Sequence, residues 1–329
     1  MAQTEASRMR ALQVNDHGET PVIVSKVIPT PAKGEILVRI AACGLNFADL
    51  LIVDGTYQDI PPLPVTLGLE ASGTVEAVGE GVADLTPGQR VAVNAGHGGL
   101  AEYGVFDAWA AVPIPDSMDF ETAAAFVVAY GTSHLGLVRR ARLQPGERLV
   151  VLGAAGGVGL TAVEIGAALG AEVVAVARGP EKLAVAEAAG AHVMLDSEVV
   201  DLRAALKEMG GVDVVYDAVG GDLSTAATRA CRPEGRVLLV GFASGELPRL
   251  AANHLLVKNV DVLGFYWGGY RRFAPDVLSD DLSELFDLFR AGKLSPQISR
   301  TFPFSRAAEA LAHLRSRAAT GKIVVTMQG

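Results

Sequence analysis

A glycine-rich segment at residues 153–159 carries the clearest chemistry in this sequence. It reads Gly-Ala-Ala-Gly-Gly-Val-Gly and directly follows the apolar run at residues 148–152. Glycine has no Cβ, so the backbone can approach a pyrophosphate closely, and the N–H groups and positive dipole of the following helix then face the phosphates. The usual GxGxxG spacing occurs with alanine in first place, as Ala154-x-Gly156-x-x-Gly159. The predicted dinucleotide-binding residues of this turn are Ala155, Gly156, Gly157 and Val158.

Such a turn can also serve only to pack a helix against a strand. Its place between a strand and a helix, within a longer βαβ series, favours dinucleotide binding. The residues after the next apolar run, 172–177, indicate which dinucleotide binds, because NAD enzymes commonly have a carboxylate there for the ribose hydroxyls. This chain has Ala177, Arg178 and then Lys182. Cations favour a 2′-phosphate, so the sequence predicts NADPH. The alternative is that Arg178 and Lys182 are solvated charges at a helix start.

The elements that must position these groups change along the chain. From residue 9 to about residue 114, short runs alternate apolar and polar residues between Gly and Pro turns, which predicts a mostly β region. From residue 148 to residue 240, short apolar runs alternate with helical stretches, one of them expected to begin at Val158. That pattern is typical of a parallel sheet covered on both faces. Residues 322–327 are expected to form a strand that returns to the first domain. An apolar stripe predicts one more helix; it consists of Leu278, Leu282, Leu285, Phe286 and Phe289.

Composition limits the classes of function. The 329 residues suggest about two domains, and an apolar content of 50% can fill two cores. The 28 Lys and Arg against 37 Asp and Glu give a net charge of −9, which argues against a nucleic-acid partner. Cys43 and Cys231 match neither a disulfide framework nor a zinc cluster. No 18-residue apolar run and no signal-peptide pattern are present, so we expect a cytoplasmic protein without a membrane partner, with residues 1–8 as a loose tail.

Several motifs spread over the chain from Met9 onward carry a family resemblance. They are Asn-Phe-Ala-Asp at 46–49, Gly-Leu-Glu-Ala-Ser-Gly at 68–73, Pro-Gly-Gln-Arg-Val-Ala-Val at 87–93, the glycine turn, Asp-Ala-Val-Gly at 217–220 and Thr-Gly-Lys at 320–322. In this order they resemble the zinc-independent medium-chain dehydrogenase/reductase superfamily, specifically the NADPH:quinone oxidoreductases of the ζ-crystallin type. The resemblance implies an α/β protein and a homodimer. It also implies a discontinuous GroES-like, mostly-β catalytic domain at 9–124 and 266–329, and a doubly wound Rossmann domain at 125–265.

The resemblance also implies roles for single residues. Asn46 would be a catalytic residue near the nicotinamide ribose and the acceptor, although an asparagine in a turn after a strand can be purely structural. Tyr57 stands where related enoyl thioester reductases have a proposed proton-donating tyrosine; its alternative is an aromatic side chain that lines the cleft wall. The other residues implied to contact the cofactor are Val219, Val240, Gly241, Phe242, Gly264, Phe265, Arg317 and Lys322.

The same comparison bears on metals. Zinc alcohol dehydrogenases have a Cys in the place of Asn46, a His in the place of Leu69, and a further four-cysteine cluster that this chain lacks. Zinc needs three or four converging ligands, so no metal is expected. Without a Lewis acid, the reaction should suit an acceptor that is already electrophilic.

We therefore expect an NADPH-dependent reductase that transfers hydride to a quinone-type small-molecule acceptor in a cleft between the two domains. The main alternative is an enoyl-CoA or other enone reductase, for which a basic patch such as Arg271-Arg272 would bind the CoA phosphates. A third possibility, from another class, is an NADPH-binding structural or RNA-associated protein with little turnover. The net charge of −9 argues against RNA.

Overall fold

The computed structural model describes residues 7–327, which separate into two compact units. Unit 1 contains the described residues up to Val128, then Arg271–Phe286 and the chain from Pro296 onward; unit 2 contains Ala129–Tyr270 and Asp287–Ser295. Most of the expected loose tail, residues 1–6, lies outside the described residues, and the first strand already begins at Arg8.

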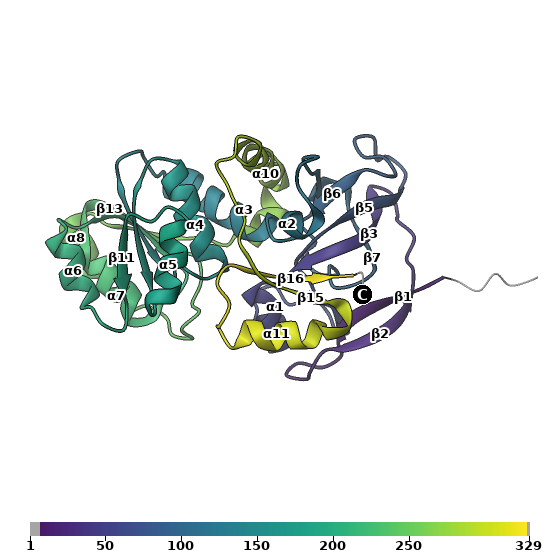
Figure 1. Cartoon of the computed structure of the whole chain (residues 1–329), viewed down its shortest axis with the longest axis horizontal. Coiled ribbons are helices and arrows are strands. Elements are labelled where there is room, and N and C mark those ends of the chain that lie inside the picture. Colours follow the sequence, from purple (N-terminus) through teal and green to yellow (C-terminus); the bar gives the residue numbers. More distant parts are fainter. Residues whose placement is uncertain (1–6, 328–329) are drawn as a thin grey trace, which may run out of the picture. The chain divides into compact units, whose positions relative to one another are not determined.

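Unit 1 is built mainly from antiparallel strands (Figure 1). A three-stranded sheet has the order β2-β1-β4, and a seven-stranded sheet has the order β15-β16-β3-β5-β6-β8, with β7 paired to β3. The strands are β1 (Arg8–Val14), β2 (Val22–Val27), β3 (Glu35–Gly44), β4 (Val65–Thr66), β5 (Glu70–Val78), β6 (Arg90–Val93), β7 (Tyr103–Asp107), β8 (Ala111–Pro113), β15 (Ile298–Pro303) and β16 (Lys322–Thr326). This confirms the mostly β first domain.

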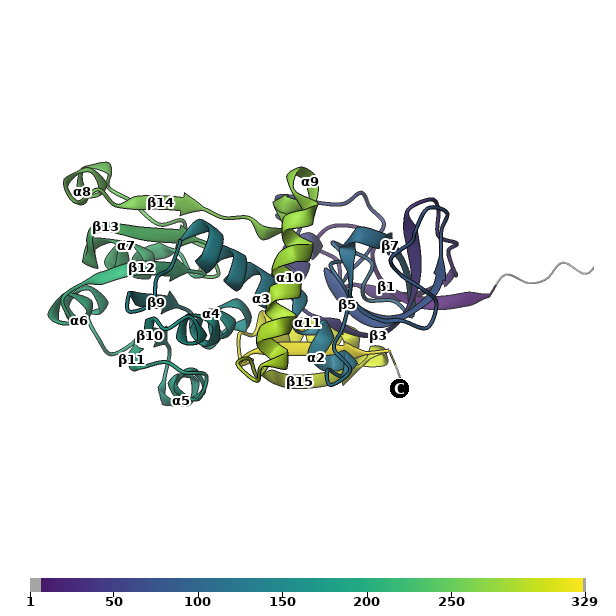
Figure 2. The ribbon, with the colours of Figure 1, turned by 90° about the horizontal axis from the view of Figure 1, so that it is seen from above.

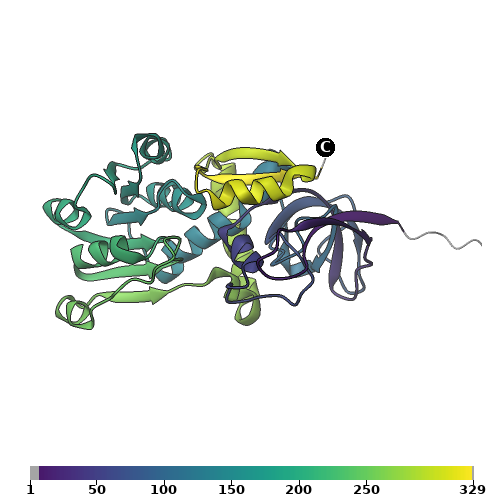
Figure 3. The same ribbon diagram turned by 90° about the horizontal axis from the view of Figure 1, so that it is seen from below.

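Short helices complete unit 1. α1 (Phe47–Val53) and α11 (Ala307–Arg315) contact each other, and Figure 3 shows the yellow α11 beside the dark purple α1. α2 (Phe120–Ala124) packs on β3 and β5. α10 (Pro275–Arg290) begins in unit 1 and ends in unit 2. It buries four residues of the predicted apolar stripe, Leu278, Leu282, Leu285 and Phe286, and leaves the fifth, Phe289, half-buried.

The closing strand returns to the first domain, as predicted. β16 runs antiparallel to β3, with Val324 opposite Gly44, and parallel to β15. Beyond the end of β3, the Leu45 N–H donates to the Ile323 carbonyl at 2.9 Å. This pairing places the first residue of β16, Lys322, next to the segment that follows β3.

Unit 2 contains a six-stranded parallel sheet of order β11-β10-β9-β12-β13-β14, which Figure 2 shows in sequence across the sheet. The strands are β9 (Arg148–Leu152), β10 (Glu172–Ala177), β11 (Val193–Asp196), β12 (Val212–Asp217), β13 (Cys231–Leu239) and β14 (Asp261–Gly264). The helices are α4 (Gly157–Ala168), α5 (Pro180–Ala188), α6 (Leu202–Glu208), α7 (Gly221–Ala230) and α8 (Ala252–Lys258). Two more helices cross the boundary between the units: α3 (Val127–Leu135) and the short α9 (Tyr270–Phe273).

Helices cover both faces of this sheet, because successive strand residues point to opposite faces and are apolar on both. Gly166 of α4 packs directly on Leu149 and Val173, which lie on one face. Val150 and Val174 lie on the other face, in one apolar cluster with residues of α6 and α7. The doubly wound α/β fold is thereby confirmed.

Two details differ from the sequence expectation. The helix expected from Val158 begins one residue earlier, at Gly157. The domain bounds also differ: residues 125–128, which the resemblance placed in the Rossmann domain, belong to unit 1, and residues 266–270 and 287–295, which it placed in the first domain, belong to unit 2. There the Ser295 N–H donates to the Glu164 carboxylate of α4, a contact that sequence reasoning could not foresee. Among residues 7–327, no helix is both long enough and apolar enough to cross a membrane.

Candidate functional site

The glycine turn joins β9 to α4 in unit 2, and its glycines have different roles. Gly153 has a φ of +75°, a conformation that favours glycine, and makes the tight turn directly after the strand. A Cβ on Gly159 would lie 2.0 Å from the Gly153 carbonyl oxygen, so only glycine fits there. Gly156 is exposed, and a Cβ on it would meet only the Gly153 oxygen, at 3.3 Å. Space beside Gly156 is therefore open to a ligand.

The N-terminus of α4 suits an anion. Gly156 is its N-cap and provides no side chain to satisfy the first N–H groups of this 12-residue helix. The next two helical residues, Gly157 and Val158, are only half-buried, whereas Ala155 is buried against the protein. Uncapped backbone N–H groups at the positive end of a helix dipole are the usual way to bind a phosphate.

The loops after β12 and β13 lie beside this turn. The Asp217 carboxylate accepts hydrogen bonds from the Val219 and Gly220 N–H groups, both at 2.9 Å. The Asp217 carbonyl accepts from the N–H groups of Val240 and Gly241, at 2.8 and 3.2 Å. A Cβ on Gly153 would come within 2.9 Å of the Val219 side chain. The structure thus brings three of the expected cofactor-binding segments together.

Two further positions complete this edge of the sheet. Phe242 is 40% exposed and packs beside Gly220. Gly264 ends β14, and nothing lies within 4 Å of where its Cβ would be. The next side chain, Phe265, is buried and contacts the Tyr270 ring edge-on, with 6.2 Å between ring centroids. The Phe265 N–H donates to the Leu239 carbonyl at 3.1 Å, so this residue continues the pairing of β14 with β13.

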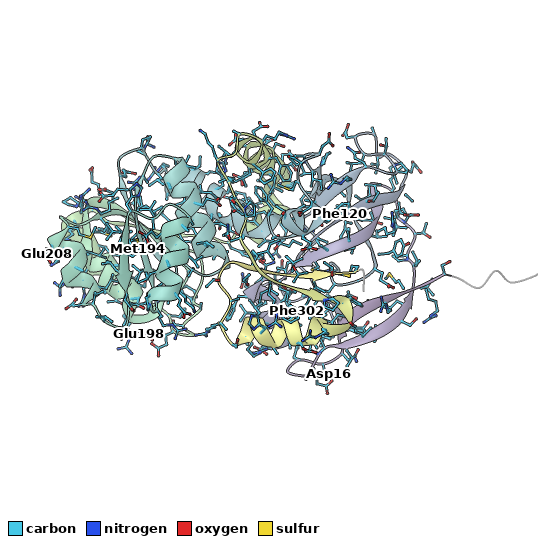
Figure 4. All side chains as sticks on the ribbon, viewed as in Figure 1. Asp16, Phe120, Met194, Glu198, Glu208 and Phe302 are labelled. Atoms are coloured by element: carbon cyan, nitrogen blue, oxygen red, sulfur yellow. The ribbon has the colours of Figure 1, made fainter. Side chains whose placement is uncertain are left out.

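Two cations lie after β10, at the start of α5. Arg178 is exposed and Lys182 is half-buried. Burial lowers the pKa of Lys182, and the neighbouring positive charge of Arg178 lowers it further, while Glu198 opposes this shift. Figure 4 labels Glu198, just past β11. Nearby Asp196 is opposite Ala177 in the sheet, and its Oδ1 accepts the Glu198 N–H at 3.0 Å.

Unit 1 contains a buried polar cluster that we call the Asn46 cluster: Asn46, Asp49, Glu70 and Lys322. Lys322 Nζ donates to the Leu45 carbonyl, to Asn46 Oδ1 and to Glu70 Oε1, each at 2.7 Å. Asn46 Nδ2 donates to Glu70 Oε1 at 2.8 Å and to the Gly44 carbonyl at 3.3 Å. The side chains of Lys322 and Glu70 are 5% and 0% exposed. Residue Asn46 as a whole is 8% exposed.

Asp49 holds the backbone of this cluster in place. Its Oδ2 accepts the Asn46 N–H at 2.8 Å and its Oδ1 accepts the Gly68 N–H at 3.0 Å. Burial raises the pKa of Asp49 to about 7, although the two backbone hydrogen bonds and the Lys322 charge act in the opposite direction. Through these two hydrogen bonds Asp49 organises the turn at Asn46 and ties it to the segment at Gly68.

The remaining expected residues lie elsewhere in unit 1. Tyr57 follows α1, is half-buried and packs against the apolar core, while its N–H donates to the Leu51 carbonyl at 3.2 Å. Arg317 is exposed in the turn after α11, with a φ of +57°. The resemblance implied that Lys322 extends toward the cofactor. In the structure all three of its N–H donors are instead bound inside unit 1.

Two protein-family models match the chain: "Alcohol dehydrogenase GroES-like domain" over residues 32–116 and "Zinc-binding dehydrogenase" over residues 157–287. The quinone oxidoreductase-like protein 2 homolog of Nematostella vectensis is 38% identical over 324 residues, which cover 96% of this chain and 88% of the relative. The chain belongs to the quinone oxidoreductase-like family of medium-chain dehydrogenases/reductases. It is therefore an oxidoreductase with a GroES-like and a Rossmann-type domain.

Solved structures of family members agree with this assignment. A quinone oxidoreductase from Pseudomonas syringae pv. Tomato DC3000 has a TM-score of 0.90 and 32% identity, covering 97% of this chain and 99% of that one. A mycobacterial protein complexed with NADPH has a TM-score of 0.89 and 29% identity, with the same coverage.

The residues of this family member do not fit a zinc ion. Asn46 and Leu69 stand where the zinc alcohol dehydrogenases have Cys and His. The Leu69 side chain has no atom that could bind a metal. The ammonium of Lys322 already binds the Asn46 and Glu70 oxygens. Over residues 7–327, no three His, Cys, Asp or Glu side chains are grouped so that they could hold a metal ion.

Sequence reasoning missed two residues of these sites. Gly153 was passed over because the motif was counted from Ala154. Glu70 was noted only as part of a family motif. A signal for Glu70 was present: it is a carboxylate at the start of a strand of small and apolar residues. Such a strand is expected to be buried, and a buried charge requires a partner.

Proposed function

We propose that this oxidoreductase uses NADPH to reduce a small electrophilic acceptor of the quinone type, without zinc. The observation that supports this most is the group of segments that follow the carboxyl ends of the parallel strands in unit 2. Five strand ends contribute to it, and two cations follow β10 where NAD enzymes commonly have a carboxylate. NADPH bound at this edge would supply a hydride from nicotinamide C4.

The residues of the chain would divide the binding work. Backbone N–H groups at the start of α4 would hold the pyrophosphate, and Arg178 and Lys182 would hold the 2′-phosphate. The backbone at Val240–Phe242 and Gly264 would contact the nicotinamide half. Asn46 and Tyr57 are proposed as the catalytic residues, as the resemblance implies.

Asn46 and Leu69 do not offer the Cys and His ligands of zinc-dependent relatives, which favours acceptors that need no Lewis acid. A quinone takes up hydride to give a stabilised hydroquinone anion, which water can protonate. The enoyl-CoA alternative needs a site for the CoA phosphates, and the Arg271-Arg272 pair offers little. Arg271 donates to the Asn94 carbonyl and lies over the Trp109 ring, and Arg272 pairs with Asp59 at 3.1 Å.

A panel of acceptors tests the proposal directly. We expect loss of the nicotinamide absorbance at about 340 nm with quinones, faster with NADPH than with NADH. Pre-incubation with a zinc chelator should leave this rate unchanged, and elemental analysis should find no stoichiometric zinc. The absence of turnover with every quinone, or one zinc per chain together with inhibition by chelation, would contradict the proposal.

Replacing both Arg178 and Lys182 by alanine should raise the NADPH dissociation constant at least about tenfold, since each charge-assisted hydrogen bond to the 2′-phosphate contributes roughly 1.5–3 kcal/mol. NADH lacks this phosphate, so its affinity should change little. Calorimetry with both cofactors measures the difference. If NADPH and NADH weaken equally, the two residues have only a structural role.

We also propose a homodimer formed through unit 2. Within the described chain, β14 is the last strand of its sheet and pairs only with β13. Nearby, Leu247, Leu256 and Val257 are more than 70% exposed. An unpaired sheet edge with exposed apolar side chains is a typical association surface. A monomeric mass by light scattering at micromolar concentration would argue against it.

A further inference from the structure

Three buried hydroxyl groups of unit 2 form one hydrogen-bonded group, which we call the Ser133 cluster: Ser133 of α3, Thr161 of α4 and Tyr216 of β12. Ser133 Oγ lies 2.7 Å from Thr161 Oγ1 and 3.0 Å from the Tyr216 hydroxyl oxygen. The three residues are 0%, 5% and 0% exposed. Burial of a hydroxyl group costs free energy that its hydrogen bonds only offset, so packing alone does not account for three of them here.

The hydrogen bonds of this cluster lead to the backbone. The Tyr216 hydroxyl has Ser133 Oγ as its one partner among the described residues, so its hydrogen points to Ser133; burial raises the pKa of Tyr216 and keeps that hydrogen in place. Between Ser133 and Thr161 one hydroxyl donates to the other, which leaves one hydrogen for a carbonyl. Ser133 can donate to the Val158 carbonyl at 2.9 Å, and Thr161 to the Val158 or the Ala129 carbonyl, at 3.0 and 3.1 Å. The Val158 carbonyl can therefore accept from the cluster in both arrangements.

Val158 lies in the first turn of α4, directly after the glycine turn. The Leu160 N–H makes the first backbone hydrogen bond of this helix, to the Gly156 carbonyl at 2.8 Å, so the N–H groups of the three residues between them point out of the helix end. A peptide unit is planar, so bonds that fix the Val158 carbonyl also fix the Gly159 N–H of the same unit. The Ser133 cluster thus sets the direction of a backbone donor at the proposed phosphate-binding end of α4.

The cluster also connects this turn to the segment after β12. Tyr216 directly precedes Asp217, whose carboxylate accepts the Val219 and Gly220 N–H groups. One buried group of hydroxyls therefore joins two of the segments that we propose to bind the cofactor.

We propose that the residues of the Ser133 cluster are positioning residues, which hold the first turn of α4 in the orientation that binds the pyrophosphate of the dinucleotide. This rests on the proposed function in that the ligand is NADPH. The three side chains are buried, so they act through the backbone and not by contact with the ligand. They affect NADPH and NADH equally, because both dinucleotides contain the pyrophosphate.

Thr161→Val tests this role, since it removes one hydroxyl group and keeps a branched side chain of similar size. We expect the dissociation constants of NADPH and NADH, measured by calorimetry, to rise together about threefold to tenfold, with their ratio unchanged. Thr161→Ser keeps the hydroxyl group and should bind both dinucleotides nearly as the wild-type protein does. This rescue separates the hydrogen bond of Thr161 from its packing.

The matched control is Thr228→Val in α7. Thr228 is also a helical threonine, 6% exposed, and its hydroxyl donates to the Ser224 carbonyl at 2.8 Å, near the C-terminal end of its helix. This change should lower the unfolding temperature without altering either dissociation constant. If Thr161→Val does not fold, Ser133→Ala/Tyr216→Phe removes the other two hydroxyl groups together, so that neither loses its partner, and should raise both dissociation constants in the same way.

The possible outcomes have distinct meanings. Unchanged affinities in a folded Thr161→Val protein would overturn the positioning role, as would an equal loss of affinity in Thr228→Val or in Thr161→Ser. A loss of affinity for NADPH alone would assign the effect to the 2′-phosphate and would overturn that role as well. Each of these results leaves the proposed function intact, provided that the wild-type protein binds NADPH and reduces quinones. A wild-type protein without NADPH binding would overturn the proposed function and the positioning role together.

Discussion

Replacing Gly156 by valine should abolish NADPH binding while unit 2 remains folded. In the free protein a Cβ at this position meets only the Gly153 oxygen, at 3.3 Å, and Gly156 has a φ of −79° and a ψ of 171°, which valine adopts readily. The added methyl groups would occupy the space that the pyrophosphate needs. We expect the NADPH dissociation constant to rise at least about 100-fold. Calorimetry measures the affinity, and thermal unfolding verifies the fold.

Gly159→Ala provides the matched contrast. Its Cβ would lie 2.0 Å from a backbone oxygen, so this smaller change should destabilise unit 2 itself. A folded Gly156→Val protein that binds NADPH as well as the wild-type protein does would refute the assignment of the dinucleotide site.

Replacing Tyr57 by phenylalanine should distinguish the two enzyme functions. Reduction of an enoyl thioester needs a proton at the carbon beside the carbonyl, and general acid catalysis of such a step contributes about 10²–10⁴ in rate. A hydroquinone anion needs no positioned acid. With quinones we therefore expect a loss of less than about tenfold in kcat.

A loss of about 10² or more in kcat with an enone or enoyl-CoA, at a nearly constant KM, would instead support the enoyl reductase alternative. Tyr103→Phe is a suitable control, because Tyr103 is a half-buried tyrosine of unit 1 on β7, outside the Asn46 cluster. It should be neutral with both classes of acceptor.

Local patterns predicted much of this molecule, since they report on local structure. The alternation of apolar runs and helical stretches predicted the parallel sheet, and the glycines at 153–159 predicted the turn between β9 and α4. The Asn46 cluster depends instead on contacts across 252 and 276 residues of sequence, between Lys322 and Glu70 and between Lys322 and Asn46. Lysine is usually exposed, so nothing local to Thr-Gly-Lys indicates that this one is buried. Only the pairing of β16 with β3 places it there.

The long stretch of sequence between β5 and β16 has a consequence for biosynthesis. Glu70 is translated 252 residues before Lys322, and all of unit 2 is made in between. At about 5–20 residues per second, roughly 13–50 s separate the two. During that interval the Glu70 carboxylate lacks its ammonium partner, and the seven-stranded sheet lacks β15 and β16. Unit 1 can therefore complete its seven-stranded sheet only after unit 2 has been synthesised.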